Sequence, residues 1–374
     1  MSPLNVLIKP ASSLCQLRCK YCFYHSLSED RSVSSYGFMK EEVSDIIIQK
    51  ALQEAKGSLS FAFQGGEPTL RGLEFFENFV FSVKRHNTNR LPVHYALQTN
   101  GQLIDDTWSS FFQKNNFLIG LSIDGDKSIH DSLRVTPGGL GTFNVTMRAV
   151  ESFIKFKVDF NILTVVSNRL ARHADKVYRF YKANDFRYLQ FIPCLPPLDK
   201  DAEDDLHAVS ADRYASFMIR LFDLWYEDLT HGRYVSIRRF DNYIQVLNGL
   251  PPEQCGLSGS CVCQMVIEAD GSVFPCDFYV NDDWYLGSII DRSFQELSET
   301  DRAVQFIRQS RAHPAECLNC RWYPLCRNGC RRDRYILSDE SFGISRFCPA
   351  YQAFFDAVFP RLQEIAARSA SLRT

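Results

Sequence analysis

Three cysteines near the start of the chain have a spacing that suits iron–sulfur chemistry. Cys15, Cys19 and Cys22 stand in a C-x3-C-x2-C pattern, just after the apolar run at residues 5–10. Three thiolates held this close can ligate three irons of a cubic [4Fe-4S] cluster and leave the fourth iron without a protein ligand. Structural zinc takes four ligands, usually in paired halves, so it fits three local cysteines poorly. We therefore predict a cluster whose open iron binds a substrate or cosubstrate.

A second group of cysteines lies toward the end of the chain. Nine of the thirteen cysteines fall between residues 255 and 348, and eight of them can be divided into two sets of four thiols. The first set is Cys255, Cys261, Cys276 and Cys330, and the second is Cys317, Cys320, Cys326 and Cys348. On spacing alone two zinc ribbons remain an alternative to two clusters, because C-x2-C pairs serve zinc as often as iron.

Composition places the chain among globular proteins and excludes several partner classes. It has 374 residues, of which 45% are hydrophobic and 23% charged, with a formal net charge of -2. Such a charge does not favour nucleic acid or an anionic membrane as the main partner. The first ten residues lack the basic start and apolar core of a signal peptide, and no run reaches the roughly 18 apolar residues of a membrane span. We expect a cytoplasmic protein, where so many cysteines indicate metal sites rather than disulfides.

The elements that must position these cysteines alternate between strands and helices. Short β-rich apolar runs indicate strands at residues 5–9, 59–64, 93–98, 117–123, 158–166 and 188–192. Helical spacing of apolar residues indicates helices at 39–55, 72–86, 142–156, 171–184, 211–230 and 351–367. A basic, strand-like piece follows at 234–239. Six β-α units in a row predict a parallel sheet covered by helices, either an open sheet or a partial barrel.

Polar and glycine-rich stretches follow several of the predicted strands. They are residues 64–68, 98–101, 122–125 and 194–195. In barrel-like α/β folds the carboxyl ends of the strands carry the site, so we expect these stretches on one rim with the Cys15 loop. Gly65 and Gly66 form a turn or let a ligand approach the backbone closely. Candidate substrate contacts at this rim are Tyr24, Gln64, Gln98 and Asn161, whereas His25 reads as an ordinary loop histidine.

The first cysteine motif, with aromatic Tyr21 before its last cysteine, resembles the signature of the radical S-adenosylmethionine (SAM) superfamily. This resemblance implies a partial (β/α)6 TIM-like barrel in which SAM chelates the open iron and is cleaved to a 5'-deoxyadenosyl radical. It implies that Gly65, Gly66 and Glu67 meet the SAM amino group. It also implies that Ser122 and Arg134 contact the ribose and carboxylate, and that Tyr21 and Leu195 line the adenine or methionine side.

The second cysteine region resembles the SPASM extension of peptide-modifying radical SAM enzymes. That resemblance implies two auxiliary [4Fe-4S] clusters on the two sets of four cysteines, each with every iron ligated. It further implies a radical SAM core at residues 1–234, a SPASM domain at 235–348 and a terminal helix at 349–374 that packs on the body. Cys194 and Cys263 are left over, and we interpret both as small buried hydrophobic residues.

The match extends along almost the whole chain to the anaerobic sulfatase-maturating enzymes. It rests on the segments 7–12, 22–28, 61–69, 97–101, 270–279 and 329–332. Within the Cys-Asp-Phe-Tyr segment at 276–279, the resemblance assigns Asp277 as general base, and the aromatic residues around it should raise its pKa by desolvation. Members of this family oxidise a cysteine or serine of a sulfatase to Cα-formylglycine.

The resemblance also implies two partners. One is an unfolded or nascent sulfatase segment that carries the target residue, and the other is an electron donor such as a flavodoxin or ferredoxin. Two alternatives remain open at this point. The chain could be a SPASM enzyme that crosslinks a ribosomal peptide, for example through a thioether, or a zinc- or cluster-bearing binding module without catalysis.

Overall fold

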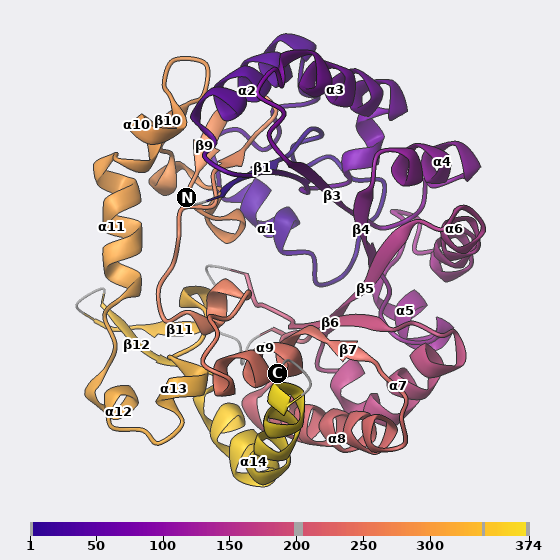
Figure 1. Cartoon of the computed structure of the whole chain (residues 1–374), viewed down its shortest axis with the longest axis vertical. Helices are drawn as coiled ribbons and strands as arrows, with labels where there is room; N and C mark the ends of the chain where they lie inside the picture. The colour runs from indigo at the N-terminus through magenta and orange to yellow at the C-terminus, as the bar shows by residue number, and fades with distance from the viewer. Residues whose placement is uncertain (1–2, 198–204, 339–340, 372–374) are drawn as a thin grey trace. The chain divides into compact units, whose positions relative to one another are not determined.

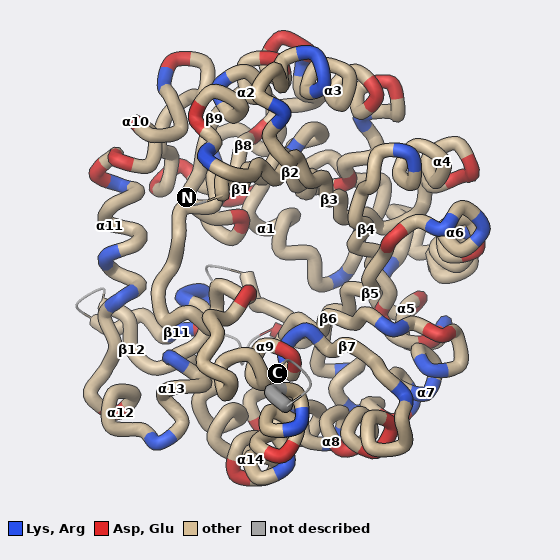
Figure 2. Tube along the Cα trace, viewed as in Figure 1, with Lys and Arg blue, Asp and Glu red and all other residues tan. Residues whose placement is uncertain are grey.

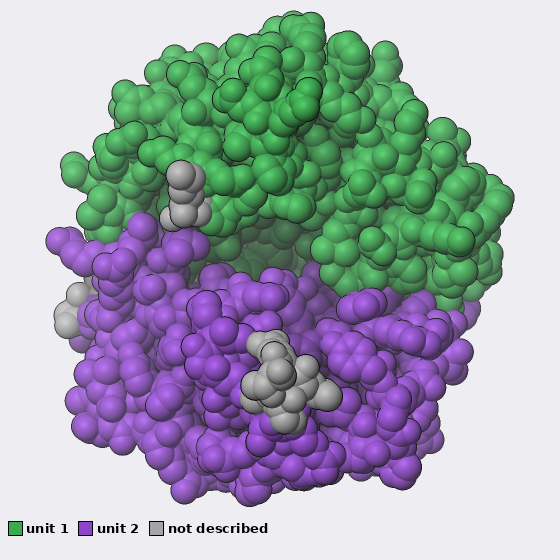
Figure 3. Space-filling view, viewed as in Figure 1, with its two compact units in different colours: residues 1–123, 130–161, 263–305 green, residues 124–129, 162–262, 306–374 purple. Residues whose placement is uncertain are grey.

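The computed structural model describes residues 3–197, 205–338 and 341–371 (Figure 1). The chain divides into two compact units, coloured separately in Figure 3. Unit 1 comprises residues 1–123, 130–161 and 263–305, and unit 2 comprises residues 124–129, 162–262 and 306–374. These units differ from the domains expected from the sequence, whose boundaries lie at residues 234 and 348. Those domain boundaries stay a prediction.

Unit 1 is built on a mostly parallel sheet of short strands. Its strand order is β10-β9-β8-β1-β2-β3-β4, in which β8 to β4 run parallel and β9 is antiparallel to both of its neighbours. The strands are β1 (Leu4–Ile8), β2 (Leu59–Phe63), β3 (Val93–Thr99), β4 (Phe117–Ser122), β8 (Val266–Ile267), β9 (Ser272–Phe274) and β10 (Gly287–Ser288). A strand from the second cysteine region therefore pairs directly with the first strand of the chain.

The helices of unit 1 lie on both sides of this sheet, most of them on the outer side. They are α1 (Phe23–Glu29), α2 (Glu41–Glu54), α3 (Leu73–His86), α4 (Asp106–Lys114), α6 (Phe143–Phe156) and α10 (Phe294–Ser298). Figure 1 shows α2, α3, α4 and α6 on the outer side of β1–β4, with α1 on the other side. Along β2 the residues alternate between buried and half-buried, because successive side chains of a strand point to opposite faces.

Aromatic packing fixes the layer between the helices and the sheet in unit 1. The ring of Phe79 on α3 lies 5.0 Å from the rings of both Phe61 and Phe63 on β2, nearly edge to face. On the neighbouring strands, Tyr95 and Phe117 stack at 5.0 Å. Each fully buried ring of this kind contributes roughly 1.5–3 kcal/mol, so this layer holds the strand ends that carry the site in place.

Unit 2 contains the last strands of the β-α series and most of the second cysteine region. Strands β5, β6 and β7 are parallel neighbours. The elements are β5 (Asp159–Val166), α7 (Ala174–Ala183), β6 (Tyr188–Pro193), α8 (Ala211–Thr230), β7 (Ser236–Ile237), α9 (Arg238–Leu247), α12 (Ala315–Leu318), α13 (Tyr323–Cys326), β11 (Arg334–Ile336), β12 (Phe342–Ser345) and α14 (Cys348–Ser371). Three elements cross the unit boundaries: β5, whose first three residues belong to unit 1, α5 (Lys127–Leu133) and α11 (Asp301–Ser310). Helix α14 packs against α8 and α9.

The sequence-based elements agree with the structure except in one short segment. The six predicted strands coincide with β1 to β6 to within one residue at either end, which confirms an α/β fold with a parallel sheet. The basic piece at 234–239 is a strand only at Ser236–Ile237, because α9 already begins at Arg238. No helix among the described residues has the length and apolar character that crossing a membrane requires.

Candidate active site and cluster-ligand sets

The Cys15 loop connects β1 to α1 and brings three thiols together in unit 1. Cys22 caps the first turn of α1, and its N–H donates to the Cys19 carbonyl at 3.1 Å. Burial raises the pKa of the Cys15 thiol to about 12, and the charges of Cys19 and Cys22 add to this effect. The three thiols are therefore near neighbours, and each is partly exposed, as a loop that holds three irons of one cluster requires.

Arg134 lies beside this loop and favours its charged form. The N–H of Arg18 donates to the carbonyl of Val135 at 2.7 Å, which joins the loop to the segment that carries Arg134. Burial raises the pKa of the Cys22 thiol, whereas Arg134 and Arg18 act in the opposite direction. The guanidinium of Arg134 also stands 5.5 Å from the ring centre of Tyr21. Two predicted SAM contacts, Tyr21 and Arg134, thus lie at the predicted cluster.

The Gly65–Gly66 turn packs against the backbone that leads into the Cys15 loop. Gly66 N–H donates to the Ser12 carbonyl at 2.9 Å, and Glu67 N–H donates to the Leu14 carbonyl at 2.8 Å. A Cβ atom on Gly66 would lie 2.1 Å from the Leu14 carbonyl oxygen. The backbone that approaches the Cα of Gly66 is therefore that of Leu14, one residue before Cys15, which explains why this position needs glycine.

Gly66→Ala should consequently disturb the cluster loop itself rather than SAM binding alone. The added methyl group forces Leu14 to move, and Cys15 moves with it. We expect the anaerobically reconstituted variant to lose about one third of its iron, which is the share of one cluster among three. Gly138→Ala is the matched control, since its Cβ would meet nothing closer than 3.9 Å. Full iron content combined with weakened SAM binding in Gly66→Ala would instead mean that SAM occupies the space next to the Gly66 Cα.

Glu67 is a buried carboxylate at the end of the glycine turn. Its Oε1 accepts hydrogen bonds from the Thr69 hydroxyl at 2.6 Å and the Thr99 hydroxyl at 2.8 Å, and its Oε2 accepts one from Asn100 N–H at 2.8 Å. Burial raises the pKa of Glu67, and these hydrogen bonds oppose the shift. Its charge in turn helps to raise the pKa of Cys15, so the carboxylate lies within electrostatic reach of the predicted cluster.

Asn100 is a site residue that the sequence analysis did not single out. Its side-chain amide approaches the Cys15 sulfur at 3.7 Å, and its Oδ1 accepts a hydrogen bond from Gln16 at 3.3 Å. Asn100 belongs to the polar stretch 98–101 at the end of β3, which was expected on the rim, so its position in that stretch was the available signal.

The remaining predicted SAM contacts lie in different units. Ser122 ends β4 in unit 1 and is buried. Leu195 follows β6 in unit 2 and is half-buried. Ser122 thus lies at the carboxyl end of its strand, and Leu195 lies two residues beyond the end of β6. Their roles toward SAM stay a prediction.

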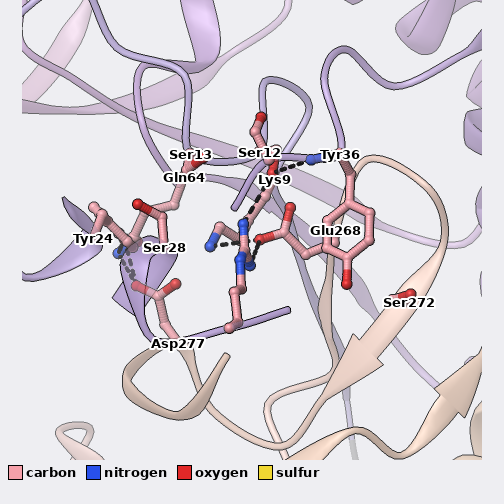
Figure 4. A network of polar contacts seen from close by, with 12 residues as sticks. Lys9, Ser12, Ser13, Tyr24, Ser28, Tyr36, Gln64, Glu268, Ser272 and Asp277 are labelled. Carbon is pink, nitrogen blue, oxygen red and sulfur yellow. Dashed lines mark hydrogen bonds and ion pairs between the residues drawn. The ribbon is translucent and has the colours of Figure 1, made fainter. Parts of the chain in front are cut away.

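Asp277 is buried within a polar cluster with Tyr24 and Gln64 (Figure 4). The Tyr24 hydroxyl donates to Asp277 Oδ2, and the Gln64 amide donates to the same oxygen at 2.8 Å and to Tyr24 Oη at 2.7 Å. Asp277 Oδ1 is buried and has no hydrogen-bond partner among the described residues. Burial raises the pKa of Asp277, while Lys9 and the Tyr24 hydroxyl oppose the shift. A buried carboxylate with one unpartnered oxygen and a raised pKa has the properties of a general base.

A buried ionic group lies next to this cluster and was not predicted. Glu268 Oε1 forms ion pairs with Lys9 Nζ at 2.9 Å and with Arg31 Nη1 at 2.7 Å (Figure 4). Burial acts to raise the pKa of Glu268, but the two cations outweigh burial and the pKa is lowered. Arg31 also donates to the Ser12 hydroxyl at 3.3 Å, so the group joins the residues before the Cys15 loop to the segment before Asp277.

Glu268→Gln should destabilise unit 1 strongly. The change leaves two buried cations without their shared carboxylate, and breaking a buried pair in this way costs about 3–5 kcal/mol of unfolding free energy. Denaturant titration of the purified apoprotein measures the loss. Glu299→Gln, at an exposed position, is the control and should change the midpoint little. A Glu268→Gln midpoint equal to that of the parent would mean that the two cations find other partners.

The second cysteine region supplies two groups of thiols in unit 2. In one group, the charges of Cys255 and Cys261 help to raise the pKa of Cys330, after burial and Asp333. The fourth member of this set, Cys276, belongs to unit 1, where it directly precedes Asp277. In the other group, burial raises the pKa of Cys326 to about 12, and the charges of Cys348, Cys317 and Cys320 contribute. All four members of the second predicted set are therefore neighbours.

The thiols do not converge on a single point. Among residues 3–197, 205–338 and 341–371, no three His, Cys, Asp or Glu side chains are close enough to hold a single metal ion. Of the two leftover cysteines, Cys194 is buried as expected, whereas Cys263 is only half-buried and its thiol lies 3.9 Å from the Met265 sulfur.

Comparison with known proteins gives matches over both cysteine regions and over the full length. Residues 10–180 match the radical SAM superfamily, and residues 261–321 match the SPASM family, described as an iron-sulfur cluster-binding domain. A cysteine-type anaerobic sulfatase-maturating enzyme from Clostridium perfringens is 48% identical over 98% of this chain and 99% of its own length. A serine-type anaerobic sulfatase-maturating enzyme from Bacteroides thetaiotaomicron is 28% identical over 96% of this chain and 90% of its own length.

Solved structures agree with these sequence matches. The structure described as "native anSMEcpe with bound AdoMet and Kp18Cys peptide" has a TM-score of 0.94 and 47% identity, and covers 98% of this chain and 100% of its own. The structure of Streptococcus suis SuiB bound to precursor peptide SuiA has a TM-score of 0.64 at 16% identity, covering 92% of this chain and 76% of its own. The SuiB likeness shows the shared fold alone.

Proposed function

The chain belongs to the anaerobic sulfatase-maturating enzymes of the radical SAM superfamily, and we propose that it oxidises a peptidyl cysteine of a sulfatase to Cα-formylglycine. The preference for cysteine is supported by 48% and 44% identity to cysteine-type relatives, against 28% and 29% to serine-type relatives. The family as a whole is an oxidoreductase family that acts on cysteine or serine.

The observation that carries this function is the environment of Asp277. Its Oδ2 is held by Tyr24 and Gln64, which fixes the direction of the carboxylate and leaves the buried Oδ1 to meet a substrate thiol. Lys9, held by Glu268, adds a positive charge nearby that opposes the effect of burial. Asp277 therefore takes the thiol proton. Together with the loss of a Cβ hydrogen atom and one electron, this converts the cysteine to a thioaldehyde, which water hydrolyses to the aldehyde with release of hydrogen sulfide.

The cofactors are SAM and three [4Fe-4S] clusters, and the residues present fit them. Eleven of the thirteen cysteines form the ligand sets: Cys15, Cys19 and Cys22; Cys255, Cys261, Cys276 and Cys330; and Cys317, Cys320, Cys326 and Cys348. When bound, these groups supply a carbon radical that removes a Cβ hydrogen and a route for the electron that then leaves. The chain's own residues supply position, charge and a proton acceptor.

The polar residues around the Cys15 loop are suited to orient SAM. Glu67 Oε2 has a single hydrogen bond from Asn100, and a carboxylate oxygen can accept a second from the SAM ammonium. Arg134 supplies a cation for the SAM carboxylate beside the cluster loop. Ser122 and Leu195 then complete the ribose and adenine sides.

The partners follow from the same chemistry. One is an unfolded or nascent sulfatase segment, since Asp277 is buried and only an extended peptide can bring a cysteine to it. The other is a small electron-transfer protein of the flavodoxin or ferredoxin type. A reducing compartment such as the cytoplasm suits eleven thiolate ligands and two further thiols.

The decisive experiment incubates the reconstituted enzyme anaerobically with SAM, a reductant and a peptide that carries a sulfatase-type cysteine. Mass spectrometry should show a product that has lost its sulfur and gained an aldehyde, and an aldehyde-reactive probe should label it. The same peptide with serine in place of cysteine should react more slowly. A product that keeps its sulfur in a thioether would replace this function with peptide crosslinking, and an unchanged peptide without SAM cleavage would indicate a binding module.

A further inference from the structure

Arg334 is a buried arginine that binds the main chain at three places in unit 2. It begins β11 and is 6% exposed. Its Nη1 donates to the Ser310 carbonyl at 2.6 Å, its Nε to the Asn328 carbonyl at 3.2 Å and its Nη2 to the Gly329 carbonyl at 3.2 Å. A planar guanidinium suits this task, because its donors point in fixed, diverging directions. The group is therefore held in one orientation.

One of these contacts leads to the first auxiliary ligand set. The hydroxyl of Ser310, whose carbonyl binds Arg334, accepts a hydrogen bond from the N–H of Cys261 at 2.7 Å. Gly329, the second carbonyl partner, directly precedes Cys330 in the chain. The guanidinium thus binds Ser310, which contacts Cys261, and Gly329, which precedes Cys330. Both cysteines are ligands of this set.

The third contact leads to the second auxiliary ligand set. Asn328 lies two residues after Cys326, and Gly329 N–H donates to the Cys326 carbonyl at 3.0 Å. The side chain of Asn328 accepts a hydrogen bond from Ser345 N–H at 2.8 Å, three residues before Cys348. The same guanidinium therefore supports the backbone that carries ligands of both sets.

Electrostatics agree with this placement. Between residues 306 and 335 there are seven arginines and two acidic residues. Figure 2 shows separate blue segments along α11 and near α13. Positive charge here favours thiolates and the added electron of a reduced cluster.

We propose that Arg334 is a shared positioning residue for the two auxiliary clusters, whose fixed positive charge raises the reduction potential of both. This inference rests on the proposed function, since it takes both sets to hold clusters. Its consequence for the reaction is that the two clusters accept the substrate's electron at linked potentials, both set by one guanidinium.

The test is a redox titration of the reconstituted full-length enzyme, followed by electron paramagnetic resonance. Arg334→Met should make the reduction of both auxiliary clusters about tenfold less favourable, which corresponds to about 59 mV for one electron. The cluster on the Cys15 loop, identified by the change in its spectrum when SAM is added, should keep its potential and serves as the internal reference.

Two further variants separate charge from mechanical support. Arg334→Lys keeps the charge and loses only part of the hydrogen bonds that the guanidinium makes, so both auxiliary clusters should still form, with potentials near those of the parent. Arg331→Met is the matched control, because Arg331 is similarly buried and donates to the Phe306 carbonyl at 2.8 Å, but it directly follows Cys330 of the first set. This control should shift the reduction potential of the first auxiliary cluster and leave that of the second unchanged.

The iron content and the reduction potentials of these variants decide whether the proposal holds. Full iron content with unchanged potentials in Arg334→Met would overturn the proposal, as would loss of both auxiliary clusters in Arg334→Met and Arg334→Lys alike. Loss in the Met variant but retention in the Lys variant would support it. A parent enzyme with zinc in place of the auxiliary clusters would instead overturn the cofactor assignment of the proposed function, irrespective of Arg334.

Discussion

Asp277→Asn should lower formylglycine formation by about a hundredfold or more, the effect typical of losing a general base. Asparagine keeps the shape of the side chain and can still bind Tyr24 and Gln64, but it has no basic oxygen for the substrate thiol. Because SAM binding and cleavage do not use this carboxylate, deoxyadenosine should still form. Quantifying deoxyadenosine and aldehyde in the same reaction should show the first without a matching amount of the second.

A nearby acidic residue provides the control for this experiment. Asp283 is exposed and lies in the 3-10 helix that follows Asp277, so Asp283→Asn should leave both products at parental amounts. If Asp277→Asn made aldehyde at the parental rate, Asp277 would be a structural loop residue, and the crosslinking alternative would become the better reading.

Replacing Cys15, Cys19 and Cys22 together with alanine should abolish SAM cleavage and remove about one third of the iron. The parent should hold about twelve irons and twelve sulfides, four of each per cluster. The auxiliary sets use other cysteines and should keep their clusters. Iron and sulfide analysis, together with deoxyadenosine assays under reducing conditions, measures both effects.

Cys194→Ala is the matched control for the triple variant. Cys194 is a buried cysteine that belongs to none of the three ligand sets, so its removal should leave the iron content unchanged. Retention of SAM cleavage in the triple variant would show that another part of the chain binds the catalytic cluster.

Strand and helix positions could be predicted from the sequence, because each depends on a local pattern of apolar residues. The Cys15 loop was predicted from the spacing of its cysteines, and Asp277 from the resemblance of its Cys-Asp-Phe-Tyr segment to a known family. Gly66 shows where local reasoning fails, since a glycine pair looks the same whether a ligand or the chain's own backbone approaches it. Only the structure shows that Leu14 occupies that place.

The Lys9–Glu268–Arg31 group could not be predicted for a different reason. Arg31 and Glu268 are separated by 237 positions in the chain. They meet because β1 pairs with the two-residue strand β8, with Leu7 opposite Val266 and Ile8 opposite Ile267. That register brings Lys9 level with Glu268. A two-residue strand has too little sequence for its pairing partner to be inferred from periodicity.

The pairing of β1 with β8 has a consequence for the order in which the protein forms. The strand that leads into the Cys15 loop is made first by the ribosome, but its neighbour at residues 266–267 emerges only after most of the chain. Until then one edge of β1 lacks its hydrogen-bond partner, and Lys9 and Arg31 lack Glu268. Long-range pairing of this kind is slow to form. The loop that holds the catalytic cluster is thus completed late in biosynthesis, when seven of the thirteen cysteines of the chain have already been made.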